Sequence, residues 1–400
     1  MAFSGIGDLA ATSSAGRAGR PERAQSAARR PNQTEQKTVV AHRRDLARKD
    51  NKVTCLWHSR SFQTIPPWIL LFFWAGLGSA VPQVLRTQKG HPTIVSHGDP
   101  LPIFLQPRAL LQARWVGGRM VGIEENDSHD PQLYTVTTDG PPERIRFVIP
   151  DSGHIRINDV AAGPDGALAL GGSAYAADGK FGTFIAWIAP DRRSQTVTRT
   201  WPYVPWRITL AADGSIWTAG WVKDPPSRDV KMQFNVIKRF DQTGRVLTTS
   251  APRARAAPEE GRGDAVGGFS FLRASSDRVG WLTNGMEYIE FSLDGREIDR
   301  FEDTALMEHR RHASLSLALS SDNQVMIGVV VNRRDWTIWA LDRERRAWIR
   351  HDVTGPGEPT WGHLLGFDGP FLVADVIDSK MRRTRGLQQI VQRYKVPGAP

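Results

Sequence analysis

Apolar and polar residues alternate in short runs over most of the chain after residue 100, which is the pattern of half-buried β-strands. The clearest example joins the β-prone residues Ile208–Leu210 to the alternating segment Ser215–Thr218 through Asp213 and Gly214. Asp-Gly favours a tight hairpin turn because glycine accepts a positive φ. We therefore predict two antiparallel strands here, with Gly214 at positive φ. Gly179, in a longer loop, is expected to tolerate a side chain better.

A second hairpin follows the first. The run Asn235–Phe240 leads into the turn Asp241–Gly244, and Arg245–Thr248 continues after it. With a longer loop between the two hairpins, the segment predicts one small sheet of four antiparallel strands.

The same unit recurs along the chain. The second residues of its first turn are Gly118, Gly166, Gly214, Arg278, Asn323 and Gly369, which are spaced by 48, 48, 64, 45 and 46 residues. The longest step contains the loop-like insert Ala251–Asp264, which is rich in Pro, Arg, Gly and Glu. A period of about 40–50 residues with four strands per unit is typical of a β-propeller, in which ringed neighbours cover both faces of each sheet. A β-sandwich is the alternative, because it also has a turn every 8–12 residues or so.

The unit also resembles a known group of folds. "AADGSIWTAGW" followed by "VIKRFDQTGRV" is similar to the blade signatures of the NHL, regucalcin-like and TolB-like six-bladed propellers. The resemblance covers roughly Leu101 to Val396 and implies an all-β, six-bladed β-propeller of four-stranded antiparallel blades over residues 101–400. The group contains lyases, lactonases, sensors and scaffolds, so the resemblance implies a fold more than an activity.

The basic charge of the chain is concentrated at its start. The net charge is +10, but residues 1–60 hold 12 basic and 5 acidic residues, which leaves only +3 for the rest. The propeller is therefore near neutral, and a nucleic-acid surface is not indicated. Residues 1–60 are rich in Ala, Arg, Ser and Gln without periodic apolar positions, which predicts a disordered basic tail.

An apolar segment, residues 61–85, follows the tail and has no charged residue. Its apolar centre, Trp68–Leu77, is short for a membrane span but suits a signal-peptide core, and the small residues Gly78-Ser79-Ala80 follow it. We predict a signal peptide or a signal anchor, with a linker over 86–100, and hence a periplasmic, secreted or membrane-anchored protein with its propeller outside. A buried core helix is the alternative. The single cysteine, Cys55, precedes this segment, so the repeated units hold neither a disulfide nor a cysteine-based metal site.

Ligands of propellers usually lie at the mouth of the central axis, on loops that lead into the innermost strands. The candidate ligand-binding residues on these loops are Arg108, Arg156, Asn158, Asp159, Arg207, His312 and His363. Converging arginines suit an anionic small molecule, because guanidinium pairs with carboxylates in a fork. The alternative is that these are ordinary solvated loop charges.

The sequence assigns no catalytic residue and no metal ligand. Asn126–Asp130 holds side chains that a divalent ion such as Ca²⁺ accepts, but such clusters are common in loops. Regucalcin-like lactonases bind a metal through Glu, Asn and Asp, and their opening Glu-Gly-Pro pattern is missing from Pro102–Gln112. HExxH, Gly-x-Ser-x-Gly and phosphate-loop motifs are also missing. The leading prediction is an exported, non-catalytic propeller that binds a small ligand or a protein partner without a cofactor. The alternative is an extracytoplasmic, metal-dependent lactonase or lyase.

The last unit lacks room for a full fourth strand after Gln389–Tyr394. An open strand edge is something folded proteins avoid. Before the first unit there are two β-prone pieces, Thr93–Ser96 and Ile103–Leu105. We predict that one of them pairs with the strand near Gln389–Tyr394 and joins the two ends of the domain; the alternative is a free linker.

Overall fold

The computed structural model describes residues 91–101, 110–125, 127–176, 178–222, 236–250, 270–283, 286–302, 313–331, 335–355, 361–377 and 389–396. The chain divides into two units, Met1–Leu85 and Arg86–Pro400, and every described residue belongs to the second. The predicted tail and the apolar segment therefore lie outside the described residues. The described part is built of β-strands, and it contains no helix with the length and apolar character to cross a membrane.

Consecutive strands form antiparallel sheets of four. The first two sheets are β2 (Leu111–Val116), β3 (Arg119–Glu125), β5 (Gln132–Thr137) and β6 (Glu143–Arg146), then β7 (Ser152–Ala162), β8 (Leu168–Ala176), β9 (Phe181–Ile188) and β10 (Gln195–Arg199), with the short β4 (Asp127–Ser128) at the edge of the latter. The next two are β11 (Tyr203–Leu210), β12 (Ile216–Val222), β13 (Val236–Phe240) and β14 (Val246–Ser250), then β15 (Phe271–Ala274), β16 (Arg278–Leu282), β17 (Tyr288–Ser292) and β18 (Glu297–Phe301). The remaining strands are β19 (Ala313–Leu319), β20 (Val325–Val331), β21 (Asp335–Asp342) and β22 (Ala347–Thr354), then β23 (Trp361–Asp368), β24 (Phe371–Ile377), β25 (Gln389–Lys395) and β1 (Thr93–Leu101).

The predicted turns fall between the strands that they were expected to join. Asp213 and Gly214 separate β11 from β12, and Gly214 has a φ of 78° as predicted. The Asp213 carboxylate accepts a hydrogen bond from the Ser215 N–H at 2.9 Å, which is the side-chain-to-backbone bond that makes Asp a turn residue. The repeat period of the sequence is therefore a repeat of hairpins.

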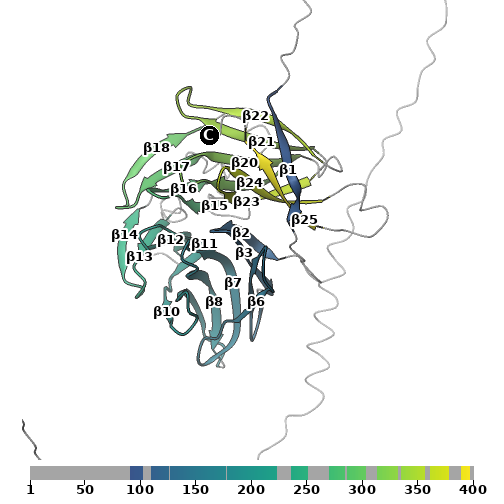
Figure 1. The fold of residues 1–400 in the computed structure, drawn as a ribbon. Coiled ribbons are helices and arrows are strands. Elements are labelled where there is room, and N and C mark those ends of the chain that lie inside the picture. Colours follow the sequence, from purple (N-terminus) through teal and green to yellow (C-terminus); the bar gives the residue numbers. More distant parts are fainter. Residues whose placement is uncertain are drawn as a thin grey trace, which may run out of the picture. The chain divides into compact units, whose positions relative to one another are not determined.

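The first strands of successive sheets form a closed series (Figure 1). β2 contacts β7, and the series runs on through β11, β15, β19 and β23. β23 then pairs in parallel with β2 through Trp115 and Gly366. A Cβ at Gly366 would lie 2.3 Å from the Trp115 carbonyl oxygen, so the two strands approach this closely because glycine has no side chain. Such a ring of four-stranded sheets is a β-propeller arrangement, and it does not fit a β-sandwich.

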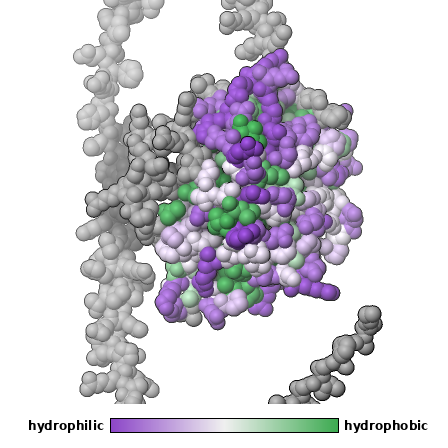
Figure 2. Space-filling view, turned by 90° about the vertical axis from the view of Figure 1, so that its left-hand side faces the viewer, coloured by the Kyte–Doolittle hydropathy of each residue, from purple (hydrophilic) through white to green (hydrophobic). Residues whose placement is uncertain are grey.

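The core lies between neighbouring sheets. Trp217 of β12 and Trp281 of β16 are almost fully buried in one apolar cluster, with Phe291 of β17 6.1 Å from the Trp217 ring. The outermost strands face solvent. On β14 and β18, Val246 and Ile298 are 47% and 49% exposed. Figure 2 shows the side on which these strands lie, with separate apolar areas among hydrophilic ones.

β1 supplies the outer strand of the last sheet and so joins the two ends of the domain, as predicted. It pairs antiparallel with β25, with Ser96 opposite Tyr394, so the segment predicted as a linker over 86–100 contributes a strand from Thr93 onward. The alternative piece, Ile103–Leu105, lies outside the described residues. β1 also pairs in parallel with β22, with Ile94 opposite Val353, which was not expected. The single strand therefore joins two neighbouring sheets at their outer edges.

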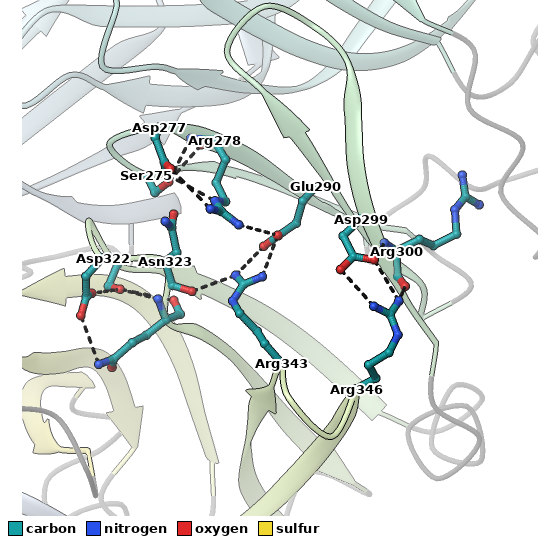
Figure 3. Close-up of polar contacts among 12 residues, drawn as sticks. Ser275, Asp277, Arg278, Glu290, Asp299, Arg300, Asp322, Asn323, Arg343 and Arg346 are labelled. Carbon is teal, nitrogen blue, oxygen red and sulfur yellow. Dashed lines mark hydrogen bonds and ion pairs between the residues drawn. The ribbon is translucent and has the colours of Figure 1, made fainter.

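Buried ion pairs also join neighbouring sheets (Figure 3). Glu290 of β17 is fully buried and receives both terminal nitrogens of Arg343, at 2.6 and 2.7 Å, from the turn between β21 and β22. Arg278 of β16 donates to the same carboxylate at 3.0 Å. Beside this network, Arg346 forms a second fork with Asp299 at 2.9 and 3.1 Å.

Candidate functional site

A cavity of about 420 Å³ lies on the axis, at the ends of the first strands and beside the turns that follow them. Its apolar wall includes Ala161 of β7, Leu210 of β11, Leu319 of β19 and Leu365 of β23. Three charged residues also line it, Arg114 of β2, Arg273 of β15 and Asp368 of β23. A concave, mostly apolar wall with a few polar groups is typical of small-molecule sites.

The cavity borders a cluster of buried charges. Arg114, Asp159, Arg207 and Arg273 are between 1% and 9% exposed and come from β2, β7, β11 and β15. The Arg114 guanidinium donates to the Asp159 carboxylate in a short contact. The same carboxylate accepts the backbone N–H groups of Ile208, at 2.9 Å, and of Val160, at 3.0 Å.

β-Bulges orient these side chains. The pairing register shifts between Leu111 and Arg114 in β2, between Ile157 and Asp159 in β7, and between Pro205 and Arg207 in β11. A bulge adds a residue to one strand and re-aims the side chain that follows it. Each of the three charged residues is thus the first regular position after a bulge.

Arg207 is held by several partners. Its Nε donates to the Ser270 carbonyl oxygen, and its Nη1 donates to the Gln112 side-chain oxygen at 3.0 Å. The guanidinium also lies 5.5 Å from the centre of the Phe271 ring. Burial lowers the pKa of Arg207, and the charge of nearby Asp159 opposes this effect.

Arg273 is less well satisfied. Its Nη1 donates to the Leu272 carbonyl oxygen at 3.0 Å, and Arg114 Nη1 approaches the same oxygen at 3.4 Å. The buried Nε of Arg273 has no hydrogen-bond partner in the described structure. Burial first, and then the charge of Arg114, lower the pKa of Arg273 well below its usual range. Two guanidinium groups from residues that line the cavity thus converge on one backbone oxygen.

His363 of β23 lies near the same charges. Burial, together with Arg273, Arg207 and Arg114, lowers the pKa of its imidazole to about 4. At neutral pH the ring is therefore uncharged and able both to donate and to accept a hydrogen bond.

The structure brings together three of the residues singled out from the sequence, Asp159, Arg207 and His363. Asn158 donates from its side chain to the Pro205 carbonyl oxygen at 3.0 Å and so links β7 to β11, and Arg156 is exposed. Arg108 and His312 lie outside the described residues. The cavity adjoins the turns after the first strands, whereas the sequence argument placed the site on the loops before them.

Sequence reasoning missed Gln112, Arg114 and Arg273. Each is a polar residue within the apolar first strand of its unit, in "LQARWV" and "FLRA". A long charged side chain in the innermost strand of a propeller is unusual, because that strand crowds the axis. Screening the first strands for such residues, rather than the loops, would have found both arginines.

No metal centre emerges from the part of the chain that the structure describes: it contains no group of three His, Cys, Asp or Glu residues that could hold an ion. Within the segment proposed for Ca²⁺, Asn126 lies outside the described residues. Asp130 pairs with Arg146 at 2.6 Å, and the His129 ring packs edge-on against His154.

Comparisons with known proteins assign no family. No protein-family model matches the chain, and no curated protein does. Among solved structures, BBS1N in complex with ARL6DN is similar over 74% of this chain and 80% of that chain, at 11% identity and a TM-score of 0.40. A puromycin-hydrolyzing peptidase from Mycobacterium tuberculosis is similar over 73% of this chain and 46% of that chain, at 13% identity and a TM-score of 0.41. Similarities this distant carry no argument about function, which has to come from the site itself.

Proposed function

We propose that this chain is an exported, non-catalytic, six-bladed β-propeller that binds a small molecule in its axial cavity. The observation that carries the proposal is the cavity of about 420 Å³, to which the first strand of each sheet or the turn after it contributes lining residues. This volume lies within the range of about 300–1,000 Å³ that small-molecule pockets occupy.

The strand pairing supports a count of six blades. Each of the first five units supplies its own four antiparallel strands, and β1 completes the sheet of β23, β24 and β25. The sixth blade is thus built from both sides of the domain, as in propellers that close by strand exchange.

Binding suits the charged cluster better than catalysis does. Asp159 is the carboxylate nearest the cavity arginines, and its oxygens are engaged by Arg114, Ile208 N–H and Val160 N–H. These contacts hold both oxygens of the carboxylate within the protein, so neither is aimed at a substrate in the cavity. Asp159 therefore positions charge, and the uncharged His363 near the cluster is not among the residues that line the cavity.

A variant with a blocked cavity tests whether the cavity binds a small molecule. Ala212 lines the cavity and is exposed, so Ala212→Trp should fill its mouth without disturbing the core. Ligands found by thermal shift against a small-molecule library should stabilise the native protein and lose this effect in Ala212→Trp. Thr249→Trp, on the exposed face of β14, is the matched control and should bind normally. Ligands that bind both variants equally would place the site elsewhere.

The same assay tests the enzyme alternative. An ion that binds the folded state raises the melting temperature by mass action. A rise with Ca²⁺ or Zn²⁺ that a chelator reverses would favour a metal-dependent lactonase or lyase over a binding protein.

Export is the part of the proposal that rests on residues 61–85 alone. The uncharged apolar segment and the small residues Gly78-Ser79-Ala80 support it. N-terminal sequencing of the mature protein should find Val81 or a neighbouring residue. Recovery of the intact tail from the cytosol would contradict export, and recovery from membranes would favour the anchor.

A further inference from the structure

We infer that the ligand of the axial cavity is a small organic anion whose carboxylate or phosphate group binds Arg273 and Arg114. This inference rests on the proposed function, because it names the chemistry of the ligand in that same cavity. Charge balance, an unsatisfied donor and the apolar wall support it independently.

The charge balance of the cluster favours a negative ligand. Two buried guanidinium groups line the cavity, those of Arg114 and Arg273, and the buried carboxylate beside them, Asp159, is already engaged by Arg114. The acidic residue that does line the cavity, Asp368, is already paired with Arg393 at 2.8 Å. A buried charge without a partner is costly, and a bound anion would neutralise the positive charge of the cavity wall.

Arg273 is the cavity residue whose donors are least satisfied. Its Nε is buried and has no partner within the described chain, and the residue is one of those that line the cavity. Ser276 and Ser320 at the cavity are less suitable because their hydroxyls are used locally. Ser276 donates to the Ser321 carbonyl oxygen at 2.6 Å, and Ser320 is bonded to the Gln324 N–H at 2.8 Å. Arg273, with Arg114 beside it, is therefore the group that an anion would meet.

The rest of the cavity calls for an apolar body on the same ligand. Leu210, Leu319, Leu365 and Phe367 line it, and its volume exceeds what an inorganic ion would fill. An anionic head against Arg273 and an apolar remainder against these side chains would satisfy both parts of the wall.

Matched phenyl compounds test the charge requirement. Benzoate and phenyl phosphate carry the two candidate head groups, and benzylamine carries the opposite charge on a similar body. At millimolar concentration and constant ionic strength, at least one anion should raise the melting temperature by mass action, and benzylamine should not. The better anion identifies the head group, and inorganic phosphate alone should bind at least tenfold more weakly than phenyl phosphate if the apolar wall contributes.

The variant Arg273→Met tests whether Arg273 is the residue that binds the anion. This variant should weaken binding of the better anion at least tenfold, and it should melt at a higher temperature than the native protein when no ligand is present. The second effect follows because the substitution removes a buried charge that lacks a partner. Arg343→Met is the control, because it breaks a paired arginine and should melt at a lower temperature. A purely structural role for Arg273 would lower the melting temperature and leave the anion affinity of folded Arg273→Lys unchanged.

The outcomes separate this inference from the proposed function. If benzylamine or neutral compounds bind as well as the anions, and Ala212→Trp blocks them, the cavity binds ligands but the anion inference is overturned. If neither the phenyl compounds nor a wider library binds at the cavity, both proposals are wrong. If anions bind equally to native protein, Arg273→Met and Ala212→Trp, binding is to the surface and the inference is again overturned.

Discussion

Asp375 of β24 has a buried carboxylate oxygen, Oδ1, without a hydrogen-bond partner in the described residues. Burial raises the pKa of this carboxyl to about 7. The pKa of Asp375 is higher in the folded than in the unfolded state. The contribution of its protonated carboxyl to the free energy of unfolding is therefore fully present below about pH 4 and is lost as the pH rises through about 7. We therefore expect Asp375→Asn, which cannot ionise, to be more stable than the native protein at pH 8 by about 1–3 kcal/mol, and to show no such gain near pH 4.

Chemical denaturation at pH 4 and pH 8 measures this difference. The control is Asp294→Asn, because Asp294 is exposed and hydrogen-bonded to Ser292, and its pKa is lowered. It should show no gain at pH 8. If Asp375→Asn is the less stable protein at pH 8, the carboxylate has a partner that stabilises its charge.

Gly214 tests backbone strain in a turn. Its φ is 78°, and a Cβ there would lie 2.7 Å from the Gln242 side-chain nitrogen, so we expect Gly214→Val to cost about 1–2 kcal/mol. Gly140, outside the left-handed region, should tolerate the same change better. Thermal melting of the two variants gives the comparison, and equal costs would show that φ is not what constrains Gly214.

The expectation for Gly179 changes with the structure. A longer loop was expected to tolerate a side chain, but Gly179 has a φ of 80°, and only the space around it is open. Gly179→Val therefore carries the same backbone strain as Gly214→Val and avoids only the contact with Gln242. Loop length, which a sequence shows, does not determine the local φ.

Individual residues could be predicted from the sequence more easily in the turns than in the candidate site. Asp213 and Gly214 were placed correctly because their own side-chain chemistry fixes the turn. Arg114 was missed because the bulge after Leu111 decides where its side chain points, and a bulge arises from the pairing of two strands. A single strand's sequence does not contain that information.

At the scale of the element, β1 has two buried side chains, Ile94 and Leu101, and Ile94 is the more deeply buried. Ile94 is fully buried in a cluster with Trp336 and Ile338, whereas its neighbour Val95 is 51% exposed. We expect Ile94→Ala to cost about 2–5 kcal/mol and Val95→Ala less than about 0.5 kcal/mol. Urea denaturation of both variants measures the difference, and similar costs would mean that β1 does not close the ring in solution.

The pairing of β1 shows what an edge argument can and cannot predict. An unpaired edge near Gln389–Tyr394 was enough to predict a partner from before the first unit, and Ser96 does lie opposite Tyr394. The parallel pairing of Ile94 with Val353 was not predictable, because it depends on how far two neighbouring sheets are rotated around the axis.

At the scale of the whole molecule, buried charges fasten neighbouring blades. Glu290 is shared by Arg278 from its own sheet and Arg343 from the next. Removing Arg343 leaves the buried Glu290 carboxylate with Arg278 as its remaining partner, so Arg343→Met should cost about 1–3 kcal/mol. Arg296→Met, at an exposed pair with Asp294, should change stability by less than about 1 kcal/mol.

Double substitution sharpens this test. In Arg343→Met/Glu290→Gln both charges are removed, so part of the lost stability should return. Purely additive costs in the cycle would show that the two residues do not interact in solution.

The second blade has a related contact with the first. Arg192 donates two hydrogen bonds to the Glu143 carboxylate of the first blade, at 3.0 and 3.1 Å.

The architecture as a whole was the most predictable level. Turn positions repeat with a nearly constant step, and each step matches one hairpin pair in the structure. Contacts between sheets, including the Glu290 network, were not predicted because they join residues 53 positions apart whose facing depends on the completed ring.

Because β1 pairs with β25, the domain can complete its fold only at a late stage of translation. Val95 pairs with Lys395, so a strand made at the start of the domain waits for its partner while about 300 further residues are translated. At roughly 5–20 residues per second this interval is about 15–60 s, during which the other blades can already form. Protection of the nascent domain from proteases should therefore arrive in one late step, when β25 emerges, and a chain stopped just before that strand would remain an open and cleavable arc.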